Sequence, residues 1–258
     1  MKFKIAIIGT GKVAWHFSTS LENAGHIITE VYGRDLAKAR RLTSQLYDTD
    51  AQDHLDFTES AAEIFIVAVA DDAISEVADA VLLPENSILV HTSGTVPLEV
   101  LGYSSAEHTG VVYPLQSFSL HRTVTWEEVP ILLEAEDPDT LSKLKKLVKT
   151  LSAQHYVVRS KDRNAVHVAA VFASNFTNHM IRIAEEIMLR QGLDFEMIKP
   201  LIIEQISKCL ELGPKAAQTG PASREDMETL ENHHLFLQYN DQLAEIYRLI
   251  SQDIIDSQ

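Results

Sequence analysis

The stretch IAIIGTGKVA, residues 5–14, decides how the rest of the sequence is interpreted. Four apolar residues suited to a buried strand lead directly into a glycine turn, and an amphipathic helical pattern follows over 12–23. A strand, a G-x-G-x-x-G/A turn and a helix are together the context in which this motif binds a dinucleotide. Gly9 permits the tight turn, Gly11 lets the backbone approach a pyrophosphate, and Ala14 allows close packing of helix on strand. A glycine turn without a ligand is the alternative. The predicted contacts are Gly9, Thr10, Gly11, Lys12, Val13 and Ala14.

The first half of the chain alternates short β-rich runs with helical patterns. The predicted strands span 3–8, 26–32, 64–69, 87–91, 109–113 and 129–133, with a further short strand at 154–158. Between them, the predicted helices span 13–24, 35–46, 73–82 and 137–151. The runs IFIVAV and SILV are apolar throughout, as is typical of strands covered on both faces. This alternation predicts a doubly wound, mainly parallel sheet, in a Rossmann α/β domain over 1–158.

The second half of the chain has no clear strand pattern. It predicts an all-helical domain over 159–258. One long helix is expected over 161–191 and a second over 194–213. A capping box at 223–226 is expected to open a final helix or pair of helices.

The end of the second predicted strand indicates which dinucleotide binds. An NAD site usually carries Asp or Glu about 20 residues beyond the glycines, but this sequence has Gly33-Arg34 there. Lys38 follows Arg34 by one helical turn, so two cations can converge on a 2′-phosphate. An ordinary solvated helix face is the alternative. The pattern favours NADP(H) over NAD(H) as the cofactor.

Composition argues against several classes of partner. The 258 residues carry 37 Asp and Glu against 22 Lys and Arg, and the formal net charge of −15 disfavours nucleic acid. No apolar run reaches the roughly 20 residues that span a bilayer, and the start lacks a signal-peptide pattern. We therefore expect a cytoplasmic protein with no membrane partner. The lone Cys209 excludes an internal disulfide, and His233-His234 forms a poor chelating pair on a helix, so no metal is expected.

Further candidate residues follow the predicted strands, where ligands of open α/β sheets bind. Ala70 follows IFIVAV and is expected to border the cofactor. Thr92 and Ser93 follow SILVH and are expected on the nicotinamide side. Gln116 and Ser117 follow GVVYPL and offer neutral hydrogen-bonding groups to a substrate. Turn formation alone is the alternative for each.

The long predicted helix carries a polar stripe on an otherwise apolar surface. A helix that is apolar over most of its circumference is buried, and its polar groups then need partners. The stripe is therefore predicted to face a ligand cleft, or else to hydrogen-bond another helix or subunit. At 100° per residue it occupies an arc of about 100° and consists of Asn164, His167, Val171, Ser174, Asn175, Asn178 and Arg182.

Five motifs make the chain similar to a known family. They are IGTGKVA (8–14), HTSG (91–94), YPLQSF (113–118), HVAAVFASNF (167–176) and TGPASRED (219–226). Over essentially its whole length the chain resembles the bacterial Rossmann-like proteins with a C-terminal helical domain of unknown function. These are labelled NADP oxidoreductases and are related to pyrroline-carboxylate reductase and the deazaflavin-dependent NADP reductases. The chain departs from that family at Tyr113, where the family usually has His, and at Glu225, where it usually has Gly.

The resemblance implies hydride transfer between NADP(H) and a small carbonyl or imine substrate, held between the nicotinamide and the long helix. His167 is expected as the proton donor, with Lys161 as its rival and a structural core histidine as the alternative. Asn175 and Asn178 are expected to contact the substrate, and Arg224 could bind a substrate carboxylate.

Apolar later helices predict a homodimer through the helical domain. Two alternative functions are an NADP(H)-binding sensor without turnover and a structural oligomer with a vestigial cofactor loop.

Overall fold

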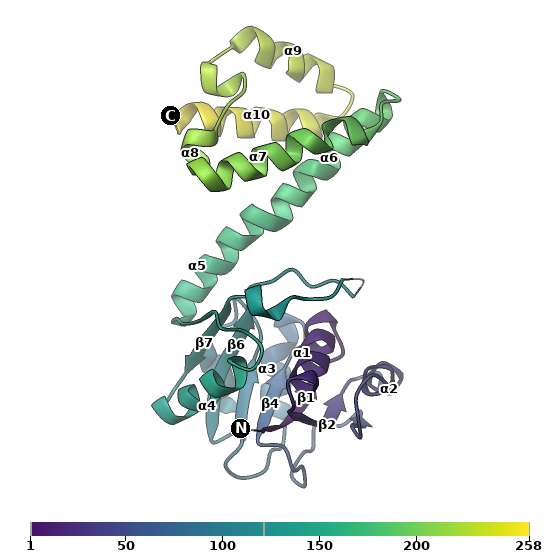
Figure 1. Cartoon of the computed structure of the whole chain (residues 1–258), viewed down its shortest axis with the longest axis vertical. Coiled ribbons are helices and arrows are strands. Elements are labelled where there is room, and N and C mark those ends of the chain that lie inside the picture. The colour runs from purple at the N-terminus through teal and green to yellow at the C-terminus, as the bar shows by residue number, and fades with distance from the viewer. Residues whose placement is uncertain (1, 121, 258) are drawn as a thin grey trace. The chain divides into compact units, whose positions relative to one another are not determined.

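The computed structural model describes residues 2–120 and 122–257, which form two compact units divided between His179 and Met180 (Figure 1). The first unit contains an α/β sandwich and the start of a long helix. The elements of the second unit are all helices within its described residues. The predicted combination of an α/β part followed by a helical part is confirmed.

Within the described residues, eight strands form one sheet in the order β3-β2-β1-β4-β5-β6-β7-β8. Each neighbouring pair is parallel except β6 and β7, which are antiparallel. This confirms the predicted mainly parallel, doubly wound sheet. The strands are β1 (Lys4–Ile8), β2 (Ile27–Tyr32), β3 (Asp50–Gln52), β4 (Ile64–Val67), β5 (Ile88–His91), β6 (His108–Pro114), β7 (Ile131–Ala135) and β8 (His155–Val157).

Strand β3 was not predicted. It has three residues, two of them polar, and it pairs with the edge of β2 from Glu30↔Asp50 to Tyr32↔Gln52. A run this short carries no detectable alternation of apolar and polar residues, so only its pairing with β2 defines it as a strand.

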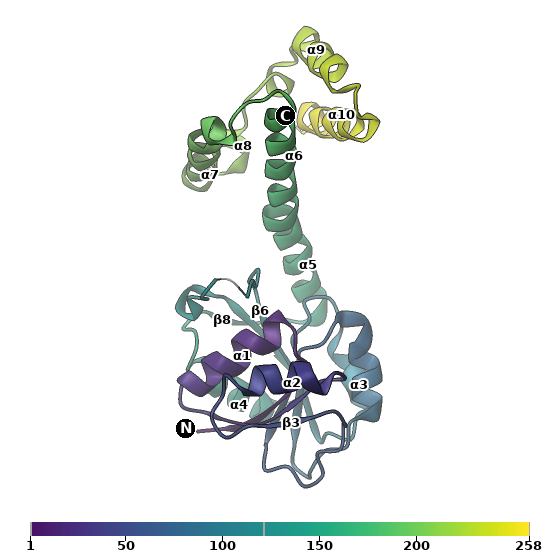
Figure 2. The same ribbon diagram turned by 90° about the vertical axis from the view of Figure 1, so that its right-hand side faces the viewer.

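Helices cover both faces of the sheet (Figures 1 and 2). Ile5 and Ile7 of β1 belong to the core that also contains side chains of α1 (Lys12–Asn23), α2 (Leu36–Thr43) and α4 (Pro138–Val148). Ala6 and Ile8 belong to the opposite core, which contains side chains of α3 (Ile74–Ala80) and of the 3₁₀ segment Leu98–Tyr103. Successive strand residues point to opposite faces, so strands buried on both sides are apolar at every position.

The long predicted helix is present, with an irregularity inside it. Helix α5 (Ser160–Ala170) leads into a π-helical turn, Val171–Phe176, and α6 (Thr177–Arg190) follows without a break. The Thr177 hydroxyl donates to the Phe172 carbonyl at 3.2 Å, a spacing of five residues. Such turns are frequent at functional sites.

The burial predicted for this helix is not found in the single chain. Val168, Phe172 and Phe176 are 47%, 64% and 48% exposed. Arg163 is buried in α5, whereas no residue of α6 is fully buried. The apolar surface that the sequence indicated exists, but its side chains are accessible to solvent.

The second unit continues with α7 (Lys199–Leu212), α8 (Pro214–Ala217), α9 (Met227–Leu237) and α10 (Asp241–Asp256). The predicted capping box at 223–226 is wrong in its register. Ser223 lies in a 3₁₀ turn and its hydroxyl donates to the Gly220 carbonyl at 3.0 Å. Asp226 caps α9 instead, because its carboxylate accepts from the Thr229 N–H at 3.1 Å and from the Thr229 hydroxyl at 2.8 Å. The left-handed Glu225 (φ 53°) separates the two turns.

Among residues 2–120 and 122–257, none of the helices has the length and apolar character needed to cross a membrane. The expected cytoplasmic location is a separate prediction that this finding does not test.

Candidate functional site

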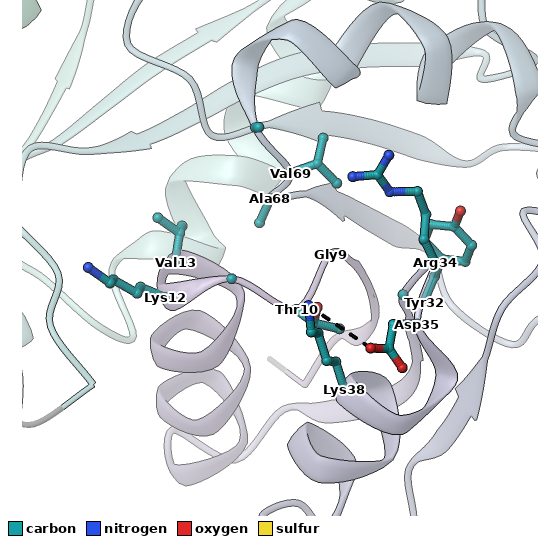
Figure 3. A pocket seen from close by; sticks show the side chains of 13 residues that line it. Gly9, Thr10, Lys12, Val13, Tyr32, Arg34, Asp35, Lys38, Ala68 and Val69 are labelled. Atoms are coloured by element: carbon teal, nitrogen blue, oxygen red, sulfur yellow. Dashed lines mark ion pairs between the residues drawn. The ribbon is translucent and has the colours of Figure 1, made fainter.

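A cavity of about 520 Å³ opens where β1, β2 and β4 end (Figure 3). Strands β1 to β3 extend the sheet in one direction and strands β4 to β6 extend it in the other, so the strand order reverses between β1 and β4. Ligands of open α/β sheets bind outside the carboxyl ends of the strands at such a point. Three segments, each following a different strand, therefore face one space. The lining residues are Gly9, Thr10, Gly11, Lys12, Val13, Tyr32, Gly33, Arg34, Asp35, Lys38, Ala68, Val69 and Ala70.

The two glycines of the turn have different roles. Gly9 has φ +130°, and a Cβ there would lie 2.3 Å from the Ala68 carbonyl oxygen. Only glycine fits this position, whatever the cavity binds. Gly11 has φ −77° and ψ −175°, which any residue can adopt, and a Cβ there would meet only the Ala68 oxygen at 4.0 Å. The missing side chain of Gly11 therefore leaves open space in the cavity.

The start of α1 offers backbone donors to the same space. Gly11 is the N-cap of α1 and has no side chain with which to cap the helix. The first N–H groups of a helix have no partner within it and carry partial positive charge. Because Gly11, Lys12 and Val13 line the cavity, this helix terminus is suited to an anion such as a pyrophosphate.

Two cations, Arg34 and Lys38, line the cavity beyond the end of β2. In Figure 3 the Arg34 guanidinium extends towards Val69, while Lys12 points away from both cations. Lys38 is 4.0 Å from the Asp35 carboxylate, and both side chains are more than half exposed, so this ion pair is weak. Within the described ranges Arg34 has no ion-pair partner.

The carboxylates near the end of β2 have hydrogen-bond partners within the protein, although Asp35 also lines the cavity. Both carboxylate oxygens of Glu30 accept from the Ser60 hydroxyl, at 3.0 and 2.9 Å, and Glu30 does not line the cavity. Asp35 accepts from the Ala37 N–H at 3.0 Å as the N-cap of α2. The acidic residue that binds a ribose 2′-hydroxyl in NAD sites therefore has no counterpart in Glu30, which lies outside the cavity, and Asp35 serves as a helix cap.

Three of the predicted cofactor residues lie outside the cavity lining. Ala14 is fully buried in the core, which is the packing role expected for it. The Thr92 hydroxyl donates to the Val67 carbonyl at 3.3 Å. Ser93 is buried, and its hydroxyl oxygen accepts from the N–H groups of Thr95 and Val96 at 3.1 and 3.0 Å. Contact of Thr92 and Ser93 with a nicotinamide stays a prediction, since both also shape a turn.

A second pocket, of about 280 Å³, lies between the end of β6 and the long helix. It brings together the predicted substrate residues Gln116 and Ser117 with the predicted catalytic residues His167 and Asn175. Four members of the predicted polar stripe face this pocket, three of them on the π-helical turn. The lining residues are Tyr113, Leu115, Gln116, Ser117, His167, Ala170, Val171, Ser174 and Asn175.

Tyr113 and His167 are directly paired in this pocket. The Tyr113 hydroxyl lies 3.0 Å from Nδ1 of His167, and the rings meet edge to face with centroids 5.9 Å apart. The Gly94 backbone packs against both rings, because a Cβ there would lie 2.6 Å from His167 Nδ1 and 2.9 Å from Tyr113 Cζ. Burial, followed by the negative charge of Asp71, raises the pKa of Tyr113, so its hydroxyl keeps its proton at neutral pH.

A buried ion pair, missed in the sequence analysis, fixes the start of α5. Arg163 is fully buried, pairs with Glu134 of β7 and donates to the Val96 carbonyl. The Glu134 carboxylate also accepts from the N–H and hydroxyl of Ser160, both at 2.8 Å. Arg163 lies one helical turn before His167, so this pair sets the position of the helix face that lines the pocket.

His91 is a second buried titratable residue that the sequence analysis missed as a candidate. It is fully buried at the end of β5, and its Nδ1 accepts from the Ser93 N–H at 3.2 Å. Burial, followed by the nearby Arg163 charge, lowers the pKa of His91 to about 4. This neutral ring supports the turn that carries Gly94.

His91 makes the stability of the fold dependent on pH. Between pH 6.5 and 4 the unfolded chain binds a proton at His91 that the folded protein excludes, so stability falls as the pH falls through this window. With about 1.4 kcal/mol per pKa unit, the loss is on the order of 3 kcal/mol. The free energy of unfolding is measured with denaturant at several pH values for the unmodified protein and for His91→Asn. It should depend less steeply on pH in the variant. Equal slopes would contradict a depressed pKa at His91.

Three other predicted residues do not line the second pocket. Lys161 and Asn178 are exposed. Arg224 is exposed in the turn Ala222–Arg224 of the second unit. No group of three or more His, Cys, Asp or Glu side chains suited to a metal ion occurs within the part of the chain that the structure describes.

Comparison with known proteins agrees with both halves of this architecture. Residues 1–116 match a Rossmann-like domain family, and residues 129–254 match a domain of unknown function (DUF2520). No curated protein matches the sequence significantly.

Solved structures provide further similarities. A "putative NADP oxidoreductase" from Bacteroides fragilis is 35% identical, with 99% of this chain and 98% of that chain covered and a TM-score of 0.90. A pyrroline-5-carboxylate reductase from Streptococcus pyogenes is 14% identical, with 99% and 98% covered and a TM-score of 0.63. A reductive aminase from Aspergillus terreus in complex with NADPH is 14% identical, with 99% and 95% covered and a TM-score of 0.75. The latter two share the fold. At 35% identity over nearly its full length, the chain belongs to the family of Rossmann-like proteins that carry this C-terminal domain of unknown function.

Proposed function

We propose that this protein is an NADP(H)-dependent oxidoreductase that transfers hydride to or from a small carbonyl or imine compound. The observation that carries the proposal is a single cavity lined by the glycine turn, the uncapped start of α1, and the cations Arg34 and Lys38. The relative from Bacteroides fragilis, named a "putative NADP oxidoreductase", and the NADPH-bound reductive aminase of the same fold support it.

The residues of the cavity fit NADP(H). The space beside Gly11 and the backbone donors of Lys12 and Val13 suit the pyrophosphate. Arg34 and Lys38 suit the 2′-phosphate, because a guanidinium and an ammonium pair well with phosphate oxygens. When bound, the nicotinamide supplies or accepts the hydride.

The second pocket is assigned to the substrate. Its amide and hydroxyl groups, on Gln116, Ser117, Ser174 and Asn175, can orient a small polar molecule. A part in proton transfer is assigned to His167 in preference to Lys161, because His167 lines the pocket and Lys161 does not. Contact of the substrate with Asn178, contact of the nicotinamide with Thr92 and Ser93, and binding of a carboxylate by Arg224 stay predictions.

A homodimer through the helical unit is also proposed. Large apolar side chains on α7, α9 and α10 are exposed, including Leu201 (67%), Ile203 (71%), Leu210 (83%), Phe236 (50%) and Leu249 (53%). In soluble proteins, extensive exposed apolar surface marks an interaction site. Light scattering should give twice the chain mass of 28.8 kDa, and a monomer at micromolar concentration would contradict the proposal.

Cofactor preference is tested by thermal unfolding with NADP⁺, NADPH, NAD⁺ and NADH. A ligand at about 100 times its dissociation constant adds roughly 2.7 kcal/mol of stability, and we expect this from the phosphorylated pair only. Arg34→Ala removes a charged partner of the 2′-phosphate worth about 1.5–3 kcal/mol, so NADPH affinity should fall about 10- to 100-fold while NADH affinity stays unchanged.

The matched control is Arg40→Ala, an exposed arginine of α2 outside the cavity lining, which should leave NADPH affinity unchanged. The absence of any shift with all four nucleotides would contradict NADP(H) binding. Equal losses in both variants would contradict the role of Arg34 and indicate a diffuse effect of charge.

A further inference from the structure

The second pocket contains two titratable side chains among its described lining residues, Tyr113 and His167. The remaining lining groups are amides, hydroxyls and hydrocarbon, none of which can release a proton near neutral pH. Reduction of a carbonyl or imine requires a proton for the oxygen or nitrogen as well as a hydride for the carbon. If this pocket holds the substrate, this pair contains the lining side chains that can supply the proton.

The geometry of the pair distinguishes its two members. His167 Nδ1 is enclosed, because the Tyr113 hydroxyl lies 3.0 Å from it and the Gly94 backbone packs against the same edge of the ring. A phenolic hydroxyl can accept one hydrogen bond and donate another. With a proton on Nδ1, His167 donates to the Tyr113 oxygen, and the Tyr113 O–H is free to donate into the pocket.

We propose that Tyr113 is the group that gives the proton to the substrate, with His167 as the relay that restores it. This inference rests on the proposed function. In the reductive direction a C–H bond forms with hydride from the reduced nicotinamide, and the π pair of the C=O or C=N bond takes the Tyr113 proton. As Nε2 of His167 takes a proton from water, the Nδ1–H proton passes to the phenolate oxygen, which leaves the neutral imidazole protonated at Nε2. Tautomerisation of the imidazole by proton exchange with water then restores the Nδ1–H form for the next turnover. The net change consumes one hydride and one proton.

Two further observations support this assignment. The raised pKa of Tyr113 keeps the hydroxyl in its acid form throughout the neutral range. The close packing of Gly94 against both rings holds the hydroxyl and the imidazole in register, and such positioning is what an efficient proton relay requires.

Tyr113→Phe tests the proposal because it removes the hydroxyl and keeps the ring. NADPH oxidation is followed with cyclohexanone, with and without methylamine, and with a panel of small aliphatic ketones. A general acid contributes about 10²–10⁴-fold, so turnover by Tyr113→Phe should fall at least 100-fold while the dissociation constant for NADPH is unchanged. His167→Gln should lose less, because Tyr113 still donates. Tyr103→Phe is the matched control, since Tyr103 is 85% exposed and outside both pockets.

The outcomes distinguish a failure of the assignment of Tyr113 from a failure of the proposed function. If Tyr113→Phe keeps most of its turnover while His167→Gln loses it, His167 donates directly and the inference is overturned. If none of these compounds causes the unmodified protein to oxidise NADPH, the proposed function fails and the inference fails with it.

NMR provides a test that does not depend on turnover. The ¹⁵N resonances of the His167 ring are measured in the protein without ligand, and they are identified because they disappear in His167→Gln. Tyr113→Phe should shift the Nδ1 resonance and Tyr103→Phe should not. An unchanged resonance in Tyr113→Phe would overturn the pairing.

Discussion

Gly11→Ala is expected to abolish tight binding of NADPH while leaving the fold intact. A methyl group at Gly11 would meet only the Ala68 oxygen, at 4.0 Å, but it would project into the cavity where the pyrophosphate is proposed to bind. Loss of one or two hydrogen bonds to a charged group costs about 1.5–3 kcal/mol each. We therefore expect an affinity loss of about 100-fold or more, which corresponds to at least ~2.8 kcal/mol.

The stability of the cofactor-free variant should change little, because two small effects oppose each other. Alanine lowers the entropy of the unfolded chain, which stabilises by about 0.4–1 kcal/mol at a compatible conformation. Alanine is also a poorer N-cap than glycine, and Gly11 caps α1, so part of this gain is lost. Melting temperature and calorimetric affinity, measured on the same sample, separate the two properties.

Two other glycines provide the controls. Gly102→Ala introduces a methyl group with nothing within 4 Å and should alter neither property. Gly9→Ala places a methyl group 2.3 Å from a backbone oxygen at φ +130° and should lose binding through loss of the fold. Full affinity in Gly11→Ala would contradict the assignment of the cavity to a dinucleotide pyrophosphate.

The features that the sequence predicted well are those set by neighbouring residues. The glycine turn, the start of α1 and the Arg34–Lys38 spacing each depend on a few consecutive positions. Apolar runs such as IFIV also indicate a buried parallel strand on their own. These local signals were sufficient for the fold class and for the position of the larger cavity.

The features that the sequence did not predict depend on contacts between distant residues. Glu134 and Arg163 are 29 positions apart, and Tyr113 and His167 are 54 apart. No single-chain pattern pairs such residues, although an acidic residue at the end of a buried strand is a usable signal of a buried partner. The π-helical turn is likewise invisible to a 3.6-residue periodicity, because it inserts a residue without altering the composition of the helix.

Glu134→Gln is expected to destabilise the α/β unit by about 3–5 kcal/mol, the cost of leaving a buried charge uncompensated. Arg163 is fully buried, and its guanidinium loses its ion-pair partner in this variant. The amide that replaces the carboxylate also has one acceptor oxygen instead of two for the Arg163 and Ser160 donors. Both effects weaken the attachment of α5 to β7.

Urea unfolding followed by tryptophan fluorescence measures the loss of stability in the α/β unit, where Glu134 lies. The two tryptophans, Trp15 and Trp126, both lie in the α/β unit, so their signal does not depend on the helical unit. The control is Lys38→Gln, which breaks an ion pair with Asp35 in the same unit, whose members are 71% and 53% exposed. An exposed pair of this kind is worth about 0–1 kcal/mol, so this variant should remain close to the unmodified protein.

The double variant Glu134→Gln/Arg163→Met separates the charge from the packing. If an uncompensated guanidinium causes the loss, removing it should restore part of the stability, so the double variant should be more stable than Glu134→Gln alone. Additive losses would instead mean that the hydrogen bonds of Glu134 to Ser160 matter more than its ion pair. In either case the start of α5 loosens one turn before His167. Glu134→Gln should therefore also weaken the Tyr113–His167 hydrogen bond, which the ¹⁵N resonance of His167 reports directly.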